Sequence, residues 1–183
     1  MATTQAPVTS TTWKIDPVHS NVEFAVKHLM ISTVKGLFSD VEGEIVIADG
    51  DPSKSSVTAS LEAASINTRT GQRDDHLRSA DFLDAANFPK ITFKSTRITG
   101  DSSDFKVTGD LTIRGVTRPI TLDVTNEGAG KDPWGGDRIA FSATTKLDRR
   151  DFGLTWNQAI EAGGVMVGND VKISIDVQAV KQV

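Results

Sequence analysis

The sequence contains no cysteine and no tyrosine, and it has only three histidines. Without cysteine the chain cannot form a disulfide, a zinc–thiolate site or a thiol nucleophile. No stretch approaches the run of about 18 apolar residues that a transmembrane helix requires. These absences exclude thiol chemistry and a helical membrane span.

The motifs of common enzyme classes are missing as well. There is no Gly-x-Ser-x-Gly nucleophile elbow, no phosphate-binding Walker loop and no Rossmann glycine fingerprint. Paired carboxylates such as Asp74-Asp75 occur, but such pairs are common in turns and helix caps. We therefore expect no catalytic residue, no metal, no cofactor and no enzymatic activity.

The first twelve residues lack the basic and apolar segments of a secretory signal. We expect residues 1–12 to form a flexible tail, residues 13–183 to form one domain, and the protein to be cytoplasmic unless a signal has been removed. A domain of this length buries roughly 70% of its unfolded surface. The net charge of −4, with both signs interspersed, argues against a nucleic-acid partner.

The segment 105–125 predicts a β-hairpin with one apolar face. Apolar and polar side chains alternate through residues 105–113, and the alternation resumes at Ile120. Gly115 permits the reversal between the two runs, and Pro119 sets φ at the start of the second. One face of this hairpin is expected to be buried and the other hydrated.

The same one-sided pattern recurs along the chain. The predicted strands cover residues 22–28, 34–47, 57–63, 91–95, 105–113, 120–125, 139–143 and 171–179. A parity change near Ser39-Asp40 predicts a bulge in the second strand, and residues 74–83 predict a short helix in the connection between the third and fourth strands. We predict an all-β fold: an eight-stranded antiparallel up-and-down barrel with one short helix.

An eight-stranded barrel either fills its interior with side chains or holds one small ligand. Small residues at inward positions, such as Gly36, Gly43 and Gly109, favour an open lumen. The residues predicted to line that lumen and bind a ligand are Phe24, Val26, Phe38, Phe93, Leu111, Ile113, Leu122, Phe141 and Ile173.

The two longest connections, residues 67–89 and 148–169, should meet at one end of the barrel, because alternate connections of an up-and-down barrel share an end. Seven arginines fall at this mouth: Arg69, Arg73, Arg78, Arg114, Arg118, Arg149 and Arg150. The residues predicted to bind a ligand head group there are His28, Arg69, Arg73, His76, Arg78 and Trp156. The alternative is that these arginines form ordinary ion pairs with carboxylates of the same loops.

Two further readings of the mouth stay open. His28 and His76 with Asp74 or Asp75 would make a two-histidine, one-carboxylate metal site, although a histidine bonded to loop backbone is the commoner case. His76 and Asp74 could also serve as acid and base in a small-molecule enzyme.

Several segments stand in a specific order and spacing: Trp13–Phe24, His28, Gly36–Phe38, His76–Phe82, Phe88–Phe93, Gly109–Pro119 and Arg150–Gly153. Together they resemble the YceI-like family, from about residue 12 to the C-terminus. The resemblance implies a lipocalin-like barrel whose elongated apolar lumen binds a polyisoprenoid or similar long-chain amphiphile.

From the resemblance and the pattern together, we expect a protein that transports or stores a long-chain isoprenoid or fatty amphiphile, with transient membrane contact. The alternatives are the small-molecule enzyme at the mouth and a packed-barrel stress-response interaction protein. The sequence leaves the oligomeric state open between a monomer and a homodimer.

Overall fold

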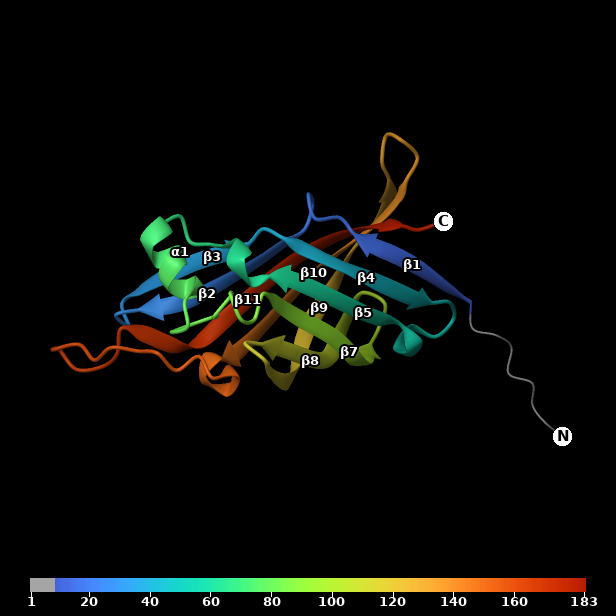
Figure 1. Cartoon of the computed structure of the whole chain (residues 1–183). Coiled ribbons are helices and arrows are strands. Elements are labelled where there is room, and N and C mark those ends of the chain that lie inside the picture. The colour runs from blue at the N-terminus through green and yellow to red at the C-terminus, as the bar shows by residue number, and fades with distance from the viewer. Residues whose placement is uncertain (1–8) are drawn as a thin grey trace.

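The computed structural model describes residues 9–183. Its elements are β1 (Ser10–Ile15), β2 (Asn21–His28), β3 (Ser32–Phe38), β4 (Val41–Ala48), β5 (Ser56–Glu62), β6 (Ile66–Asn67), α1 (Gly71–Arg78), β7 (Lys90–Gly100), β8 (Asp104–Ile113), β9 (Val116–Lys131), β10 (Asp137–Asp148) and β11 (Val167–Lys181), with 3-10 turns at Pro52–Lys54, Ala63–Ser65 and Arg149–Phe152. The predicted all-β architecture with one short helix is confirmed (Figure 1).

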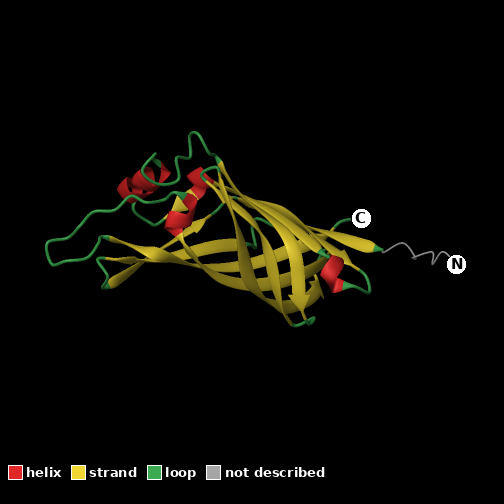
Figure 2. Cartoon of the chain, turned by 90° about the horizontal axis from the view of Figure 1, so that it is seen from below, coloured by secondary structure: helices red, strands yellow, loops and turns green. Residues whose placement is uncertain are grey.

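The strands form a closed antiparallel barrel. The sheet order is β1-β4-β5-β7-β8-β9-β10-β11, and β1 pairs with both β4 and β11, which closes the ring. The strands β2, β3 and β6 continue β1, β4 and β5 beyond bends in the chain, so that β2 pairs with β11 and β3 with β6. The wall is therefore eight strands around, as the sequence predicts. Figure 2 shows how these strands enclose the interior.

The ends of the predicted elements differ in several places, and β7, β9, β10 and β11 extend beyond the predicted ranges 91–95, 120–125, 139–143 and 171–179. The first strand begins at Ser10, so Ser10–Thr12 belong to the barrel rather than to the expected tail, whose residues 1–8 lie outside the described part. The predicted bulge near Ser39-Asp40 is the break between β3 and β4. The helix occupies Gly71–Arg78 and ends earlier than expected, because Ser79 is extended and its hydroxyl donates to the carbonyl oxygen of His76.

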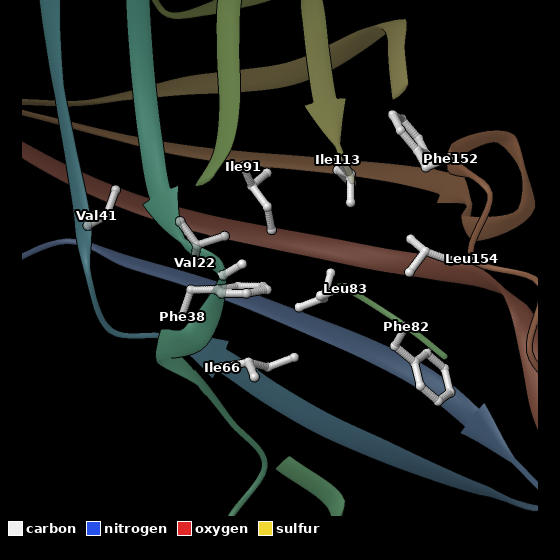
Figure 3. Close-up of a cluster of buried hydrophobic side chains, with 11 residues drawn as sticks. Val22, Phe38, Val41, Ile66, Phe82, Leu83, Ile91, Ile113, Phe152 and Leu154 are labelled. Atoms are coloured by element: carbon white, nitrogen blue, oxygen red, sulfur yellow. The ribbon is translucent and has the colours of Figure 1, made fainter. Parts of the chain in front are cut away.

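Both long connections converge at one end of the barrel, as expected from the topology. Phe82 and Leu83, which follow α1, pack in one buried cluster with Phe152 and Leu154 from the β10–β11 connection. Figure 3 shows these side chains meeting Val22, Phe38, Val41, Ile66, Ile91 and Ile113 from the wall. A smaller cluster of Val107, Val124 and Ala143 lies deeper in the barrel. We call the end with α1 the mouth and the opposite end the far end.

Candidate ligand-binding cavity

The barrel encloses a cavity of about 1240 Å³ that extends from the mouth to the far end. All nine side chains predicted to face the lumen line it: Phe24, Val26, Phe38, Phe93, Leu111, Ile113, Leu122, Phe141 and Ile173. Period-two alternation explains this agreement, since every second side chain of a strand must point inward. A barrel with a cavity of this size is not the filled barrel that one alternative reading required.

The inward glycines do not supply the open space that the sequence suggested. A Cβ on Gly36 would lie 2.4 Å from the Phe24 ring, and one on Gly109 would lie 2.5 Å from the Phe93 ring. Each glycine is therefore covered by an aromatic ring from the neighbouring strand. Because Gly36 and Gly109 have no side chain, the Phe24 and Phe93 rings can lie flat against the barrel wall, which leaves the centre of the lumen open.

The cavity is apolar along its length and polar at its two ends. At the far end its lining includes Asp51, Ser53, Asp101 and Ser102, which belong to tight turns. At the mouth the lining residues with polar atoms are Lys27, His28, Thr70, Gln72, Arg73, His76, Arg149 and Trp156. A long amphiphile would therefore meet cationic and imidazole groups at one end and carboxylate and hydroxyl groups at the other.

Three aromatic rings join the long connections at the mouth. The His76 ring of α1 stands edge-on to Trp156 of the β10–β11 connection, with centroids 4.7 Å apart, and to Phe82, at 5.1 Å. Phe82 and Trp156 are 5.3 Å apart. The His76 Nε2 lies 2.9 Å from the Asp81 carboxylate. His76 and Trp156 thus take the predicted places at the mouth, and His28 lines the cavity from the end of β2.

Arg73 also lies at the mouth as predicted. Its guanidinium donates to the Thr68 hydroxyl at 2.7 Å, to the Thr68 carbonyl oxygen and to the Thr70 hydroxyl. The buried Asp74 carboxylate accepts from the Thr68 amide and hydroxyl. Within residues 9–183 Arg73 forms no ion pair. Asp74 is committed to the Thr68 loop, which weakens its proposed acid–base role with His76.

Two of the predicted mouth residues point elsewhere, and for them the sequence expectation needs correction. Arg69 is exposed in a left-handed backbone conformation (φ 64°), and it does not line the cavity. Arg78 donates to the carbonyl oxygens of Ala64 and Ile66 and pairs with Asp75 at 3.0 Å, so it fastens α1 to the chain before it. For Arg78 the helical spacing explains the difference, because α1 turns Arg73 toward the cavity and Arg78 toward residues 64–66; Arg69 lies before α1 begins.

Arg149 lines the cavity, although nothing in the sequence distinguishes it from Arg150. Its guanidinium donates to the carbonyl oxygens of Gly168, Leu154 and Trp156 at 2.8, 2.6 and 2.9 Å. Burial lowers the pKa of Arg149 from its ordinary value, but a guanidinium stays charged at neutral pH. The neighbouring Arg150 is exposed and pairs with Asp148 at 2.6 Å. Position in the 3-10 turn Arg149–Phe152, not residue type, separates the two.

Within the described residues, no group of three or more His, Asp or Glu side chains is arranged to hold a metal ion. His76 contacts Asp81 and two aromatic rings, so the two-histidine site considered from the sequence does not form. The one α-helix of residues 9–183 is too short and too polar to cross a membrane.

Comparisons with known proteins agree with this architecture. A family model described as the YceI-like domain matches residues 13–179. A UPF0312 protein of Staphylococcus aureus is 43% identical over 88% of the chain and 93% of its own length. The crystal structure of the Campylobacter jejuni YCEI protein has a TM-score of 0.71 at 35% identity, covering 86% of this chain and 90% of that one.

A more distant structure has the same fold. A polyisoprenoid binding domain from Saccharophagus degradans has a TM-score of 0.65 at 14% identity and covers 96% of this chain and all of that one. At that identity the likeness concerns the fold alone.

Proposed function

The chain belongs to the YceI-like domain family, and from this membership and the geometry of its cavity we propose that it binds a polyisoprenoid or similar long-chain lipid inside the barrel. The observation that carries the proposal is the continuous apolar lumen of about 1240 Å³. Pockets for drug-sized ligands have volumes of roughly 300–1000 Å³. This lumen is larger and nearly free of polar groups between its two ends, as a long hydrocarbon requires.

The volume sets a scale for the ligand. A methylene group occupies roughly 30 Å³, about the liquid volume of one water molecule. The cavity of about 1240 Å³ then holds on the order of 40 methylene-sized groups. A single acyl chain would leave much of the lumen empty, so the size favours a polyprenyl tail. The Saccharophagus protein that shares this fold is a polyisoprenoid binding domain, which points to the same ligand class.

The mouth suits a polar head group. Arg73 and Arg149 are cationic, line the cavity and, within the described residues, form no ion pair. His28 and His76 add imidazole nitrogens, and Trp156 offers an indole NH. A head group that accepts hydrogen bonds is therefore expected at this end, with the tail running toward Phe93 and Phe141.

Energetics favours exchange over permanent capture. At about 0.8 kcal/mol per methylene group, a tail of several tens of carbons taken from water would exceed the practical affinity limit near 20 kcal/mol. The competing environment is a bilayer, in which the tail is already dry. Net affinity is then modest and depends on the head group and on shape, which suits a carrier or a store that loads and unloads. We assign no catalytic step to this site.

The proposal is tested by native mass spectrometry of the protein purified without detergent. We expect a bound species with the mass of a long-chain lipid, or stoichiometric uptake of a C40 polyprenol by delipidated protein. A protein that is consistently empty and takes up neither the polyprenol nor an apolar fluorescent probe would contradict the proposal.

A paired substitution locates the binding. Phe141 lines the cavity, whereas Thr144 on the same strand is exposed on the outer face. We expect Phe141→Asp to reduce polyprenol uptake by at least about tenfold, because burying a carboxylate beside a hydrocarbon tail is costly. Thr144→Asp serves as the matched control and should bind normally. Far-ultraviolet circular dichroism verifies that both variants keep the barrel.

A further inference from the structure

The tip of the β2–β3 hairpin is the most exposed apolar feature at the mouth. Met30 is 56% exposed and Ile31 is 82% exposed. The described residues contain two other large apolar side chains of comparable exposure before the C-terminal residue, Val18 and Trp134, and these lie in separate turns. Two adjacent exposed apolar side chains on a projecting tip differ from such isolated cases, which are normal on protein surfaces.

The backbone of this tip is unfavourable for the residues that form it. Leu29 and Met30 both have positive φ, 52° and 60°. Consecutive positive φ values belong to the type I′ hairpin turn, in which Asn-Gly is strongly preferred. Large side chains are therefore present where turn formation alone would select small or polar ones. Strain of this kind at a surface tip points to a role for the side chains themselves.

The tip adjoins the opening of the cavity. The Leu29 amide donates to the carbonyl oxygen of Met166 at 2.8 Å, which ties the tip to the β10–β11 connection. Met166 lines the cavity, as do Val26 and Val34 on the two strands that lead to the tip. An apolar surface therefore runs from the lumen along β2 and β3 to Met30 and Ile31. Figure 1 shows the β2–β3 hairpin (blue) and the β10–β11 connection (orange) projecting at the same end of the barrel.

The charges beside the tip are basic. Lys27 on β2 and Lys35 on β3 are exposed, and within residues 9–183 neither forms an ion pair. Exposed lysines beside an apolar tip match the interfacial region of a bilayer, where anionic phosphates surround the hydrocarbon.

We propose that the β2–β3 tip, residues 29–31, docks the mouth of the barrel on a lipid bilayer by inserting Met30 and Ile31 among the acyl chains. The proposal rests on the function proposed above, because a lipid whose tail is buried in the bilayer can enter the cavity without meeting water only when the mouth faces the bilayer. The tail then moves along Val34 and Val26 without crossing water. The Lys27 and Lys35 ammonium groups meet lipid phosphates at the rim.

The test measures flotation of the delipidated full-length protein with vesicles of phosphatidylcholine, with and without phosphatidylglycerol. We expect binding that phosphatidylglycerol strengthens, and a loss of about tenfold or more in the Met30→Ser/Ile31→Ser double variant, because two apolar side chains no longer insert. Trp134→Ser and Val18→Ser remove equally exposed side chains, 88% and 83%, away from the tip. These controls should bind vesicles as the unmodified protein does.

A second readout separates this proposal from the function on which it rests. Uptake of a C40 polyprenol from detergent micelles requires the cavity but no bilayer, so the double variant should load normally from micelles and slowly from vesicles. If the unmodified protein does not load from micelles, the proposed function fails, and flotation still decides whether the tip binds membranes.

Three results would overturn the docking proposal. One is unmodified protein that does not float with either vesicle. Another is an equal loss of flotation in Trp134→Ser. The third is a double variant that floats normally but is a monomer in light scattering where the unmodified protein is a dimer. The tip would then be a contact between two copies of the chain.

Discussion

The two ends of the barrel are built differently. At the far end the chain reverses in three turns, and in each an aspartate accepts hydrogen bonds from the amides of its own turn: Asp51 from Ser53, Asp101 from Ser103 and Asp104, and Asp132 from Trp134 and Gly136. At the mouth two long connections replace tight turns and are held by contacts between distant segments (Figure 1). The far end is determined locally and the mouth is not.

This difference shows where the fold leaves room for function. A turn closed by its own aspartate depends mainly on its own residues, which follow ordinary turn preferences, although Asp132 also accepts from Arg138. The mouth departs from such preferences, with a buried arginine, a three-ring aromatic contact and a hairpin turn made of Leu29 and Met30. Departures from local preference that tertiary structure maintains are expected at functional sites.

The largest expected effect on this difference between the two ends comes from removing the Arg149 side chain. Its guanidinium donates to four carbonyl oxygens, two in the β10–β11 connection and two at the start of β11. We expect Arg149→Ala to lower the free energy of unfolding by about 3 kcal/mol or more, because these buried and partly buried acceptors lose a charged donor. Urea denaturation measures the effect. Arg150→Ala is the matched control and should change stability far less, since Arg150 is exposed.

An unchanged unfolding midpoint in Arg149→Ala would mean that the connection is held by the apolar cluster of Phe152 and Leu154 alone. The contrast between the ends would then rest on packing, and Leu154→Ala would become the more disruptive change.

The hairpin turn gives a second test, in which stability and function should move in opposite directions. Replacing Leu29 by Asn and Met30 by Gly gives the turn its preferred sequence and should raise the free energy of unfolding by about 1 kcal/mol, because a left-handed conformation costs about that much per ordinary residue. The same change removes an inserting side chain and should weaken vesicle flotation. Urea denaturation and flotation measure the two effects.

The β8–β9 turn is the control for this substitution. Arg114 and Gly115 have the same pair of positive φ values, 50° and 72°, with glycine already at the second position. Arg114→Asn should therefore stabilise slightly and leave flotation unchanged. A loss of flotation in this variant would show that the whole mouth, not the β2–β3 tip, contacts the bilayer.

The architecture and the lumen could be predicted because they depend on period-two alternation. Phe24, Phe93 and Phe141 had to point inward once their strands were recognised. The mouth was predictable only in outline. Topology brings both long connections to one end, but it does not say that Arg73 faces the cavity and that Arg78 bonds the carbonyl oxygens of Ala64 and Ile66, since that depends on where α1 begins.

Two features of the mouth had no readable signal in the sequence. Arg149 and Arg150 are adjacent and chemically identical, and only the 3-10 turn Arg149–Phe152 buries one and exposes the other. The Leu29-Met30 reversal carries no turn residue, so its position follows from the pairing of His28 with Ser32 and not from its own composition. Local patterns do not report conformations that distant contacts impose.

The smallest expected effect concerns the far end at low pH. Backbone amides of Asp104 and Ser103, together with the Ser103 hydroxyl, hold the pKa of Asp101 at about 2. Because the folded pKa is depressed, the stabilisation is complete above the ordinary aspartate value near 4 and is lost as the pH falls toward 2. Asp101→Asn should therefore slightly lower the urea midpoint at pH 7 and flatten its decline between pH 4 and 2. Exposure and solvent screening keep this change modest. If Asp101→Asn instead abolished the acid-induced decline in the urea midpoint altogether, the acid stability of the far end would depend on this single carboxylate. The three turns would then not be independent of one another.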